Sequence, residues 1–349
     1  MPISIEVMEI VEIKYRGYKM EEFDVIIVGG GPAGLSAAIF TQLDGWKTLI
    51  LESNWVGGQA AIAYTVMNYP GFPPGDGAVL VKNLEQQVTS PLPAGVGAEL
   101  RHEEVSSINV DEKVIKTNAN QYKTKAIILA MGSKMKKLKL PGEKEFLGKG
   151  VSYCAKRDCE MFIGKKVLVI GGGNTTAKSA LLARNKTNDV ILVHRRESLR
   201  AYRSMIKRLQ KEGIEIWYNT EVKEIKGNNN VNSVVIVNNR TGEEKEASVD
   251  WIVICVGTEP NTSLVRDSGI EFKGNFIKIN EQMMTNKDGK FACGEIMGCH
   301  RHIINAAAEG ASAGMAVSEF LALEKVKRKE MFEGSINGKY ADEYLAMLR

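Results

Sequence analysis

The cysteines of this 349-residue chain carry redox chemistry of their own, and two of them lie close together in the sequence. Residues 152–160 read Ser-Tyr-Cys-Ala-Lys-Arg-Asp-Cys-Glu, so Cys154 and Cys159 enclose Arg157 and Asp158. Two thiols at this spacing can form a disulfide if their Cβ atoms approach within about 4.5 Å. The sequence leaves two interpretations open: a redox pair, or two bystanders in the first turn of a helix.

The other three cysteines do not indicate a metal site or a disulfide framework. Cys255 lies within the apolar segment WIVICVG and is expected to be inert core. Cys293, Cys299, His300 and His302 match no common zinc spacing, so no metal is predicted. Five cysteines are an odd and small number for a secreted disulfide scaffold, which excludes that class of protein.

A glycine-rich turn near the N-terminus has the pattern of a dinucleotide site. Residues 23–28 (FDVIIV) are typical of a buried parallel strand, and a helical stretch follows the turn. The turn contains Gly29, Gly31 and Gly34, with Pro32 and Ala33 between the last two. Such glycines permit a tight turn, close approach to a pyrophosphate, and helix–strand packing. A second strand, residues 47–52, ends on Glu52, where an acid can bind ribose hydroxyls.

The pattern recurs in the middle of the chain, with a different charge at its end. A strand at residues 166–170 leads into Gly171, Gly173, Asn174 and Thr175, followed by a helix and a second strand, DVILVH. That strand ends on His194, Arg195 and Arg196, with Arg200 shortly after, and arginines can grip a 2′-phosphate bidentately. The first turn therefore suits FAD, and the second suits NADPH over NADH. The alternative for the arginines is an exposed basic strand end.

These residues resemble the low-molecular-weight thioredoxin reductases over about residues 21–325. Three further segments carry the resemblance: Gly57-Gly58-Gln59 with Asn68-Tyr69-Pro70-Gly71-Phe72-Pro73, then Ala130-Met131-Gly132-Ser133, and Phe291-Ala292-Cys293-Gly294-Glu295 with Arg301-His302 and the helix that begins at Ile303. The resemblance implies that Gly58, Gln59, Asn68, Gly132, Gly294, Glu295, Arg301, His302 and Ile303 contact the flavin or its ribityl chain. This chain departs from the family at Glu295, usually Asp, and at His302, usually Gln.

The family's redox motif, Cys-x-x-Cys-Asp-Gly, aligns with Cys154–Cys159 and is broken. Arg157 stands where the resemblance places the flavin-side cysteine, Asp158 keeps the acid, and Cys159 replaces the glycine. Arginine cannot exchange disulfides, but it can supply fixed positive charge near a reduced, anionic flavin. Related thioredoxin-reductase-like ferredoxin–NADP reductases also lack the cysteine pair and carry a C-terminal extension with an aromatic ring over the flavin. The tail here contains Phe332, Tyr340 and Tyr344; packing on a dimer surface is the alternative.

The predicted fold is α/β, with two Rossmann-like three-layer dinucleotide-binding domains, the NADPH domain inserted into the FAD domain. We expect an N-terminal extension at residues 1–20, the FAD domain at 21–136 and 266–325, the NADPH domain at 137–265, and a C-terminal extension at 326–349. The resemblance also implies a homodimer. No apolar run reaches the roughly 20 residues that span a bilayer, and no signal peptide is recognised, so a cytoplasmic protein that does not bind membranes is expected.

The net charge of +4 is too small to indicate a nucleic-acid partner. Lys134, Lys136, Lys137 and Lys139 form a local excess, either a solvated loop or a docking patch for an acidic protein. The leading functional hypothesis is an FAD-dependent NADPH oxidoreductase whose partner is ferredoxin or another small electron carrier. The alternatives are a thioredoxin reductase that uses Cys154 and Cys159 as a displaced pair, and a non-catalytic nucleotide-sensing flavoprotein.

Overall fold

A computed structural model of the protein describes residues 20–63, 65–90, 97–298 and 301–333, the last six of these as backbone only. The chain forms two compact units. Unit 1 consists of Met1–Ala61, Thr65–Gly132 and Pro260–Arg349, as far as these are described, and unit 2 mainly of Ser133–Glu259. The domain limits predicted after residues 136 and 265 remain predictions. The side chains of Phe332, Tyr340 and Tyr344, residues Cys299 and His300, and the N-terminal extension before Met20 lie outside the described part.

Unit 1 is built on a seven-stranded sheet in the order β3-β2-β1-β6-β5-β4, with β19 also pairing with β6. Five of its strands pair in parallel. They are β1 (Glu21–Val28), β2 (Thr48–Glu52), β3 (Glu99–His102), β6 (Gln121–Leu129) and β19 (Lys290–Ala292), whereas β4 (Val105–Asn109) and β5 (Val114–Thr117) pair antiparallel. The strands predicted at residues 23–28 and 47–52 are thus β1 and β2.

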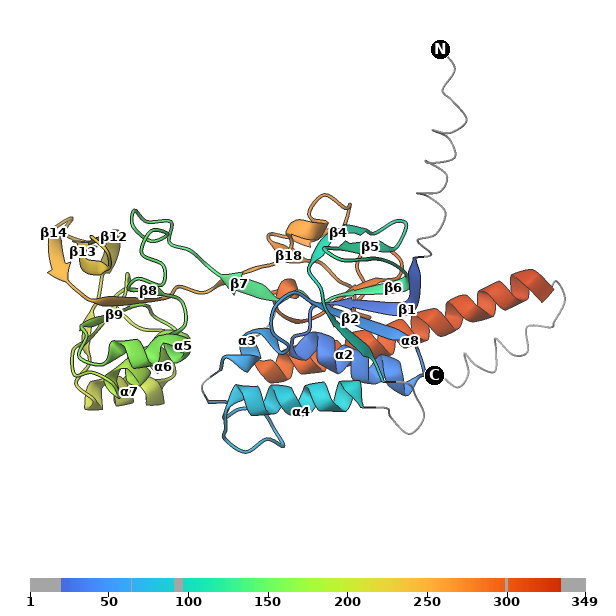
Figure 1. Ribbon diagram of the computed structural model, residues 1–349, viewed down its shortest axis with the longest axis horizontal. Coiled ribbons are helices and arrows are strands. Elements are labelled where there is room, and N and C mark those ends of the chain that lie inside the picture. The colour runs from blue at the N-terminus through green and yellow to red at the C-terminus, as the bar shows by residue number, and fades with distance from the viewer. Residues whose placement is uncertain (1–19, 64, 91–96, 299–300, 334–349) are drawn as a thin grey trace, which may run out of the picture. The chain divides into compact units, whose positions relative to one another are not determined.

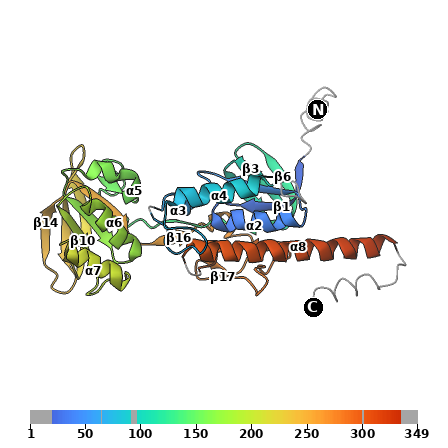
Figure 2. The same cartoon turned by 90° about the horizontal axis from the view of Figure 1, so that it is seen from below.

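Helices cover one face of this sheet. They are α2 (Pro32–Leu43), α4 (Gly77–Thr89) and the long α8 (Ile303–Glu333), which runs along α2 in both views (Figures 1 and 2). The approach of α8 to α2 requires small residues, because a side chain at Gly310 would overlap the carbonyl of Ala33, and one at Gly314 would crowd Ala37. The first turns of α8 and the start of α2 therefore lie close together, at the end of the sheet where the first glycine turn lies.

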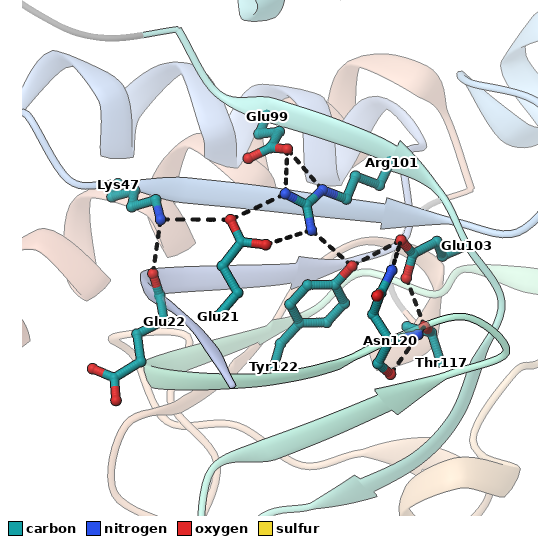
Figure 3. A network of polar contacts seen from close by, with 9 residues as sticks. All are labelled: Glu21, Glu22, Lys47, Glu99, Arg101, Glu103, Thr117, Asn120 and Tyr122. Atoms are coloured by element: carbon teal, nitrogen blue, oxygen red, sulfur yellow. Dashed lines mark hydrogen bonds and ion pairs between the residues drawn. The ribbon is translucent and has the colours of Figure 1, made fainter. Parts of the chain in front are cut away.

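A polar network ties β1, β3 and β6 together on unit 1 (Figure 3). Arg101 donates to Glu21 at 2.7 Å and to the hydroxyl of Tyr122 at 2.9 Å, and it also pairs with Glu99. The Tyr122 hydroxyl in turn donates to Glu103 at 2.8 Å. These bonds connect residues up to 80 positions apart, so they fix the first strand to the rest of the sheet.

Unit 2 is a second, smaller three-layer unit. Its five-stranded parallel sheet has the order β11-β10-β9-β15-β8, formed by β8 (Val151–Ser152), β9 (Val167–Gly171), β10 (Val190–Val193), β11 (Glu215–Trp217) and β15 (Trp251–Cys255). One face carries α5 (Ala155–Asp158), α6 (Asn174–Arg184) and α7 (Arg203–Lys211), as Figure 1 shows, and the 3₁₀ turn η1 (Cys159–Phe162) follows α5. The other face packs on the antiparallel sheet of β12 (Thr220–Gly227), β13 (Val231–Asn238) and β14 (Glu244–Ser248). The predicted α/β class with two Rossmann-like units is confirmed.

Several short elements connect the main strands and helices. β7 (Ser133–Met135) and β16 (Thr258–Pro260) pair where the chain passes between the units. Unit 1 also holds α3 (Gly58–Ala61), β17 (Phe272–Lys273), β18 (Phe276–Ile277) and the 3₁₀ turns η2 (Ser263–Val265) and η3 (Gly294–Met297). Among the described residues, no helix combines the length and the apolar character that crossing a membrane requires.

Candidate functional site

The glycine turn of unit 1 lies between β1 and α2, and its backbone is open on the side where a phosphate would bind. Gly29 has φ +110, and a side chain at Gly34 would overlap the Gly29 carbonyl oxygen, so neither position tolerates a Cβ. No atom lies within 4 Å of the place where a Cβ of Gly31 would point. The turn therefore fits a dinucleotide pyrophosphate that approaches Gly31 at the N-terminus of α2.

Glu52 ends β2 beside this turn. One carboxylate oxygen accepts the N–H of Gly30 at 2.8 Å, and the other accepts the N–H of Asn54 at 2.8 Å. These two bonds fix the carboxylate between the turn and the strand end. An acid held there is placed to bind ribose hydroxyls.

Several residues that the resemblance assigns to flavin contact lie together in unit 1. Gln59 Nε2 donates to Glu295 Oε2 at 3.4 Å, and Asn68 Nδ2 lies 3.4 Å from His302 Nδ1. Gly294 lies against Ala33 of the first glycine turn, since its Cβ would come within 3.0 Å of the Ala33 Cβ. Segments more than 230 positions apart thus converge at one place. The cofactor contacts of these residues, and of Gly58, Gly132, Arg301 and Ile303, stay predictions.

Glu309 on α8 is a further residue of this site, not predicted from the sequence. Its Oε2 accepts the N–H of Gly294 at 2.9 Å, so it holds the turn that carries Glu295. The available signal was an acid inside the small-residue helix INAAAEGASAG. Burial, with the charge of Glu309 as a second cause, raises the pKa of the Cys293 thiol well above its usual range, which makes that thiol unreactive.

The glycine turn of unit 2 repeats these features between β9 and α6. Gly171 has φ +147 and lies against the carbonyl of Cys255, while the place of a Gly173 Cβ is open to 4 Å. Asn174 accepts the N–H of Tyr202 at 2.8 Å, which connects the start of α6 to the start of α7. The buried Thr176 hydroxyl accepts the N–H of Gly173 at 3.3 Å. This turn therefore also fits a pyrophosphate, and Thr175 lies in the first turn of α6 that would face it.

The basic residues after β10 divide into one buried ring and three exposed guanidinium groups. His194 lies under the turn, because a Cβ on Gly172 would overlap its imidazole, and its Nε2 has no hydrogen-bond partner among the described residues. Burial is the main cause that lowers its pKa, so the ring is neutral at physiological pH. Arg195, Arg196 and Arg200 are exposed, and the structure shows no acid paired with them in its described part. They are free to receive a phosphate.

The segment from Cys154 to Cys159 forms the short helix α5 and the start of η1. Cys154 precedes α5, Cys159 follows it, and both thiols are free in the structure. Arg157 does not present an isolated charge: its Nε and Nη2 donate to Asp158 at 2.8 and 2.9 Å. Ser152 also donates to Asp158. Burial raises the pKa of the Asp158 carboxyl, but the hydrogen bonds from Arg157 and Ser152 outweigh it and hold that pKa below its usual range.

The four lysines of the basic segment, Lys134, Lys136, Lys137 and Lys139, are all exposed. Lys134 pairs with Glu259 at 3.4 Å. Whether they form a docking patch or a solvated loop stays open.

Comparison with known proteins gives a consistent result. Residues 23–310 match the sequence profile described as "Pyridine nucleotide-disulphide oxidoreductase". The chain is 36% identical over 305 residues to a thioredoxin reductase of Treponema pallidum, covering 86% of this chain and 97% of that protein. A Clostridium pasteurianum protein named "34.2 kDa protein in rubredoxin operon" is 33% identical over 86% of this chain and 98% of its own length. The crystal structure of Lactococcus lactis thioredoxin reductase matches with a TM-score of 0.82 at 35% identity, covering 86% and 99% of the two chains.

Proposed function

Since the chain belongs to the pyridine nucleotide-disulphide oxidoreductase family, we propose that it carries electrons between NADPH and a small one-electron protein carrier of the ferredoxin type. It is an NADPH-dependent flavoprotein oxidoreductase with FAD and NADPH as its cofactors. When bound, FAD supplies the ability to accept an electron pair and to release the electrons one at a time.

The residues of unit 1 supply the FAD site of this proposal. The turn Gly29–Gly34 receives the pyrophosphate, and Glu52, held by two backbone N–H groups, accepts hydrogen bonds from a ribose. The linked side chains of Gln59 and Glu295 orient the ribityl end, and Asn68 and His302 contact the ring system. The N-terminus of α8 adds partial positive charge on that side.

The residues of unit 2 supply the NADPH site. Gly171 and Gly173 leave the backbone open to the pyrophosphate, and the three exposed arginines after β10 bind the 2′-phosphate. The neutral, buried His194 supports the turn from below. An acid in this place would repel the phosphate, which is why NADPH is preferred over NADH.

One observation supports an exit of electrons without thiols: an ion pair stands where the family's flavin-side cysteine belongs. Arg157 donates two hydrogen bonds to Asp158, so this position offers an ion pair and no nucleophile. The homodimer implied by the resemblance stays a prediction.

A second candidate is a thioredoxin-disulfide reductase. The names of the relatives from T. pallidum and L. lactis favour it. It requires that Cys154 and Cys159 take over the relay at a changed spacing.

The deciding experiment compares acceptors with the full-length protein. NADPH oxidation is followed at equal concentrations of ferredoxin and of oxidised thioredoxin. We expect rapid turnover with ferredoxin and only slight turnover with thioredoxin, because thiol relay needs a thiolate at the flavin and a second thiol to resolve the mixed disulfide. Fast thioredoxin reduction with no ferredoxin activity would contradict the proposal and support the second candidate.

A further inference from the structure

Three cysteines of unit 2 lie on the same face of its sheet. In the parallel pair β8 and β15, Val151 is opposite Ile252, and Ser152 is opposite Val253. The pairing ends at Ser152 and Val253; two residues further on, Cys154 has extended backbone dihedrals and Cys255 ends β15. Side chains alternate along strands, so both thiols belong to the face that bears α5 and α6. Cys255 and Cys159 both pack on the hydrophobic cluster of that face.

Geometry favours Cys154 with Cys255 over Cys154 with Cys159. Neighbouring strands lie about 4.8 Å apart, which is inside the Cα separation that a disulfide accepts. Cys154 and Cys159 are separated by the four residues of α5. Residues five apart on an α-helix have Cα atoms about 8.7 Å apart, beyond the limit of about 7 Å. A bond between them would require α5 to unwind.

The environments of the two thiols differ in a way that suits a reactive and a resolving cysteine. The pKa of Cys255 is raised to about 11, mainly by burial. A hydrogen bond with Ser179 acts to lower this pKa, and the charge of a Cys154 thiolate acts to raise it, so the two thiols interact. Cys154 is partly exposed. Its thiolate also interacts with Arg157. The pKa of Arg157 is raised mainly by the hydrogen bond to Asp158, and the negative charges of Asp158 and of the Cys154 thiolate also raise it. Cys154 is therefore the thiol that meets an oxidant from solvent.

We propose that Cys154 and Cys255 form a dithiol site that hydrogen peroxide oxidises to an internal disulfide. The Cys154 thiolate attacks peroxide, the O–O bond breaks, and the departing hydroxide takes a proton to become water, which leaves a sulfenic acid. The sulfur of Cys255 then attacks the sulfenic sulfur, the S–O bond breaks, and the thiol proton leaves with the hydroxide as a second water. Two thiols and one peroxide thus give one disulfide and two waters. A low-molecular-weight thiol restores the dithiol by exchange.

This site goes beyond the proposed electron transfer and does not depend on it. It lies next to the glycine turn of unit 2, because the carbonyl of Cys255 accepts the hydroxyl of Thr176 at 3.3 Å and lies against Gly171. The resolving thiol of the proposed site therefore belongs to a residue whose backbone contacts the proposed pyrophosphate site.

The test is a disulfide map of the full-length protein after peroxide treatment. Free thiols are alkylated, and the unreduced protein is digested with trypsin. Cleavage after Lys156, Arg157, Lys245 and Arg266 puts Cys154, Cys159 and Cys255 on three different peptides. We expect a linked pair containing Cys154 and Cys255, lighter by two hydrogens than the free peptides.

Variants make the result specific. Cys255→Ser should abolish the link and leave a sulfenic acid on Cys154 that a dimedone probe captures. Cys159→Ser, and Cys293→Ser in unit 1 as the matched buried control, should leave the link unchanged. A link between Cys154 and Cys159 in the native protein would overturn the proposal. The proposal would equally fail if no link formed while peroxide drove Cys154 to higher oxidation states. Neither readout depends on the electron acceptor, so its failure is distinct from failure of the proposed function.

Discussion

Single residues at the ends of two strands give the two glycine turns opposite charge preferences. Glu52 at the end of β2 is held by the N–H groups of Gly30 and Asn54, and we propose that its carboxylate binds a ribose and would repel a phosphate. At the corresponding end of β10, Arg195 and Arg196 are exposed and unpaired within the described chain. We therefore propose that the two glycine turns discriminate between dinucleotides through one or two side chains each.

The nucleotide preference provides the test at this scale. Replacing Arg195 and Arg196 together by Gln should erase most of the preference for NADPH over NADH, measured as the ratio of kcat/KM values. A charge-assisted contact to phosphate contributes about 1.5–3 kcal/mol, or roughly ten- to a hundredfold in binding. Arg240→Gln is the matched control, since this exposed arginine pairs with Glu197 instead. A double variant that discriminates as the native enzyme does would show that the phosphate binds elsewhere.

Some residues of the turns could be predicted from spacing, and others could not. Gly29, Gly31, Gly34, Gly171 and Gly173 were predictable because the strand–turn–helix pattern places them. Gly172 was not predictable. It must be glycine because a Cβ there would overlap the His194 ring, which lies 22 positions further along the chain. The role of Glu309 at Gly294 was missed for the same reason. A local pattern does not report which distant side chain fills the space beside it.

At the scale of elements, the polar network on β1, β3 and β6 is the clearest feature that sequence patterns did not indicate (Figure 3). Strand β1 was predicted from its apolar run, but the bond between Glu21 and Arg101 joins residues 80 positions apart. The hydrogen bond from Arg101 is the main cause that lowers the pKa of Glu21. In Glu103, burial raises the pKa, yet the hydrogen bonds from Thr117, Tyr122 and Asn120 outweigh it and lower it.

This network predicts an acid-sensitive contribution to stability. Because the folded-state pKa of Glu21 lies below its unfolded value near 4.5, its contribution is complete above that value and is lost as the pH falls through the folded pKa. Arg101→Met should lower the free energy of unfolding at pH 7 by about 1.5–3 kcal/mol, the range for hydrogen bonds to charged groups. The difference from the native protein should shrink at pH 3. Thermal unfolding by circular dichroism at both pH values measures it.

A surface ion pair serves as the control for that measurement. Lys125 pairs with Asp24 at 2.6 Å, but its side chain is 56% exposed, and such pairs contribute no more than about 1 kcal/mol. Lys125→Met should therefore change the unfolding temperature little at either pH. Equal losses for both variants would show that the network adds nothing beyond ordinary surface charge.

At the scale of the whole molecule, the chain forms two compact units, each with a glycine turn between a parallel strand and a helix. The order of the two units along the chain was predictable, because each has a recognisable pattern of a strand, a glycine turn and a charged residue at the end of the next strand. The pairing of β7 with β16 between them was not, since three-residue strands leave no periodic signal. Nor did the sequence show that Cys255 shares a sheet face with Cys154, which depends on strand order rather than spacing.

The path by which electrons leave the protein is a property of the whole molecule that cysteine variants can test. If the Arg157–Asp158 pair has replaced the flavin-side thiol, a Cys154→Ser, Cys159→Ser double variant should keep its NADPH oxidation with ferredoxin or ferricyanide, within about twofold of the native rate. Thioredoxin reduction should be slight before and after the change.

The alternative, in which Cys154 and Cys159 act as a displaced redox pair, makes a separate prediction: either single variant would abolish thioredoxin reduction and leave ferricyanide reduction intact. Strong thiol-dependent turnover of thioredoxin by the native protein would therefore refute the proposed exit. The helix geometry argues against that outcome, because α5 holds Cys154 and Cys159 too far apart to resolve a mixed disulfide without unwinding.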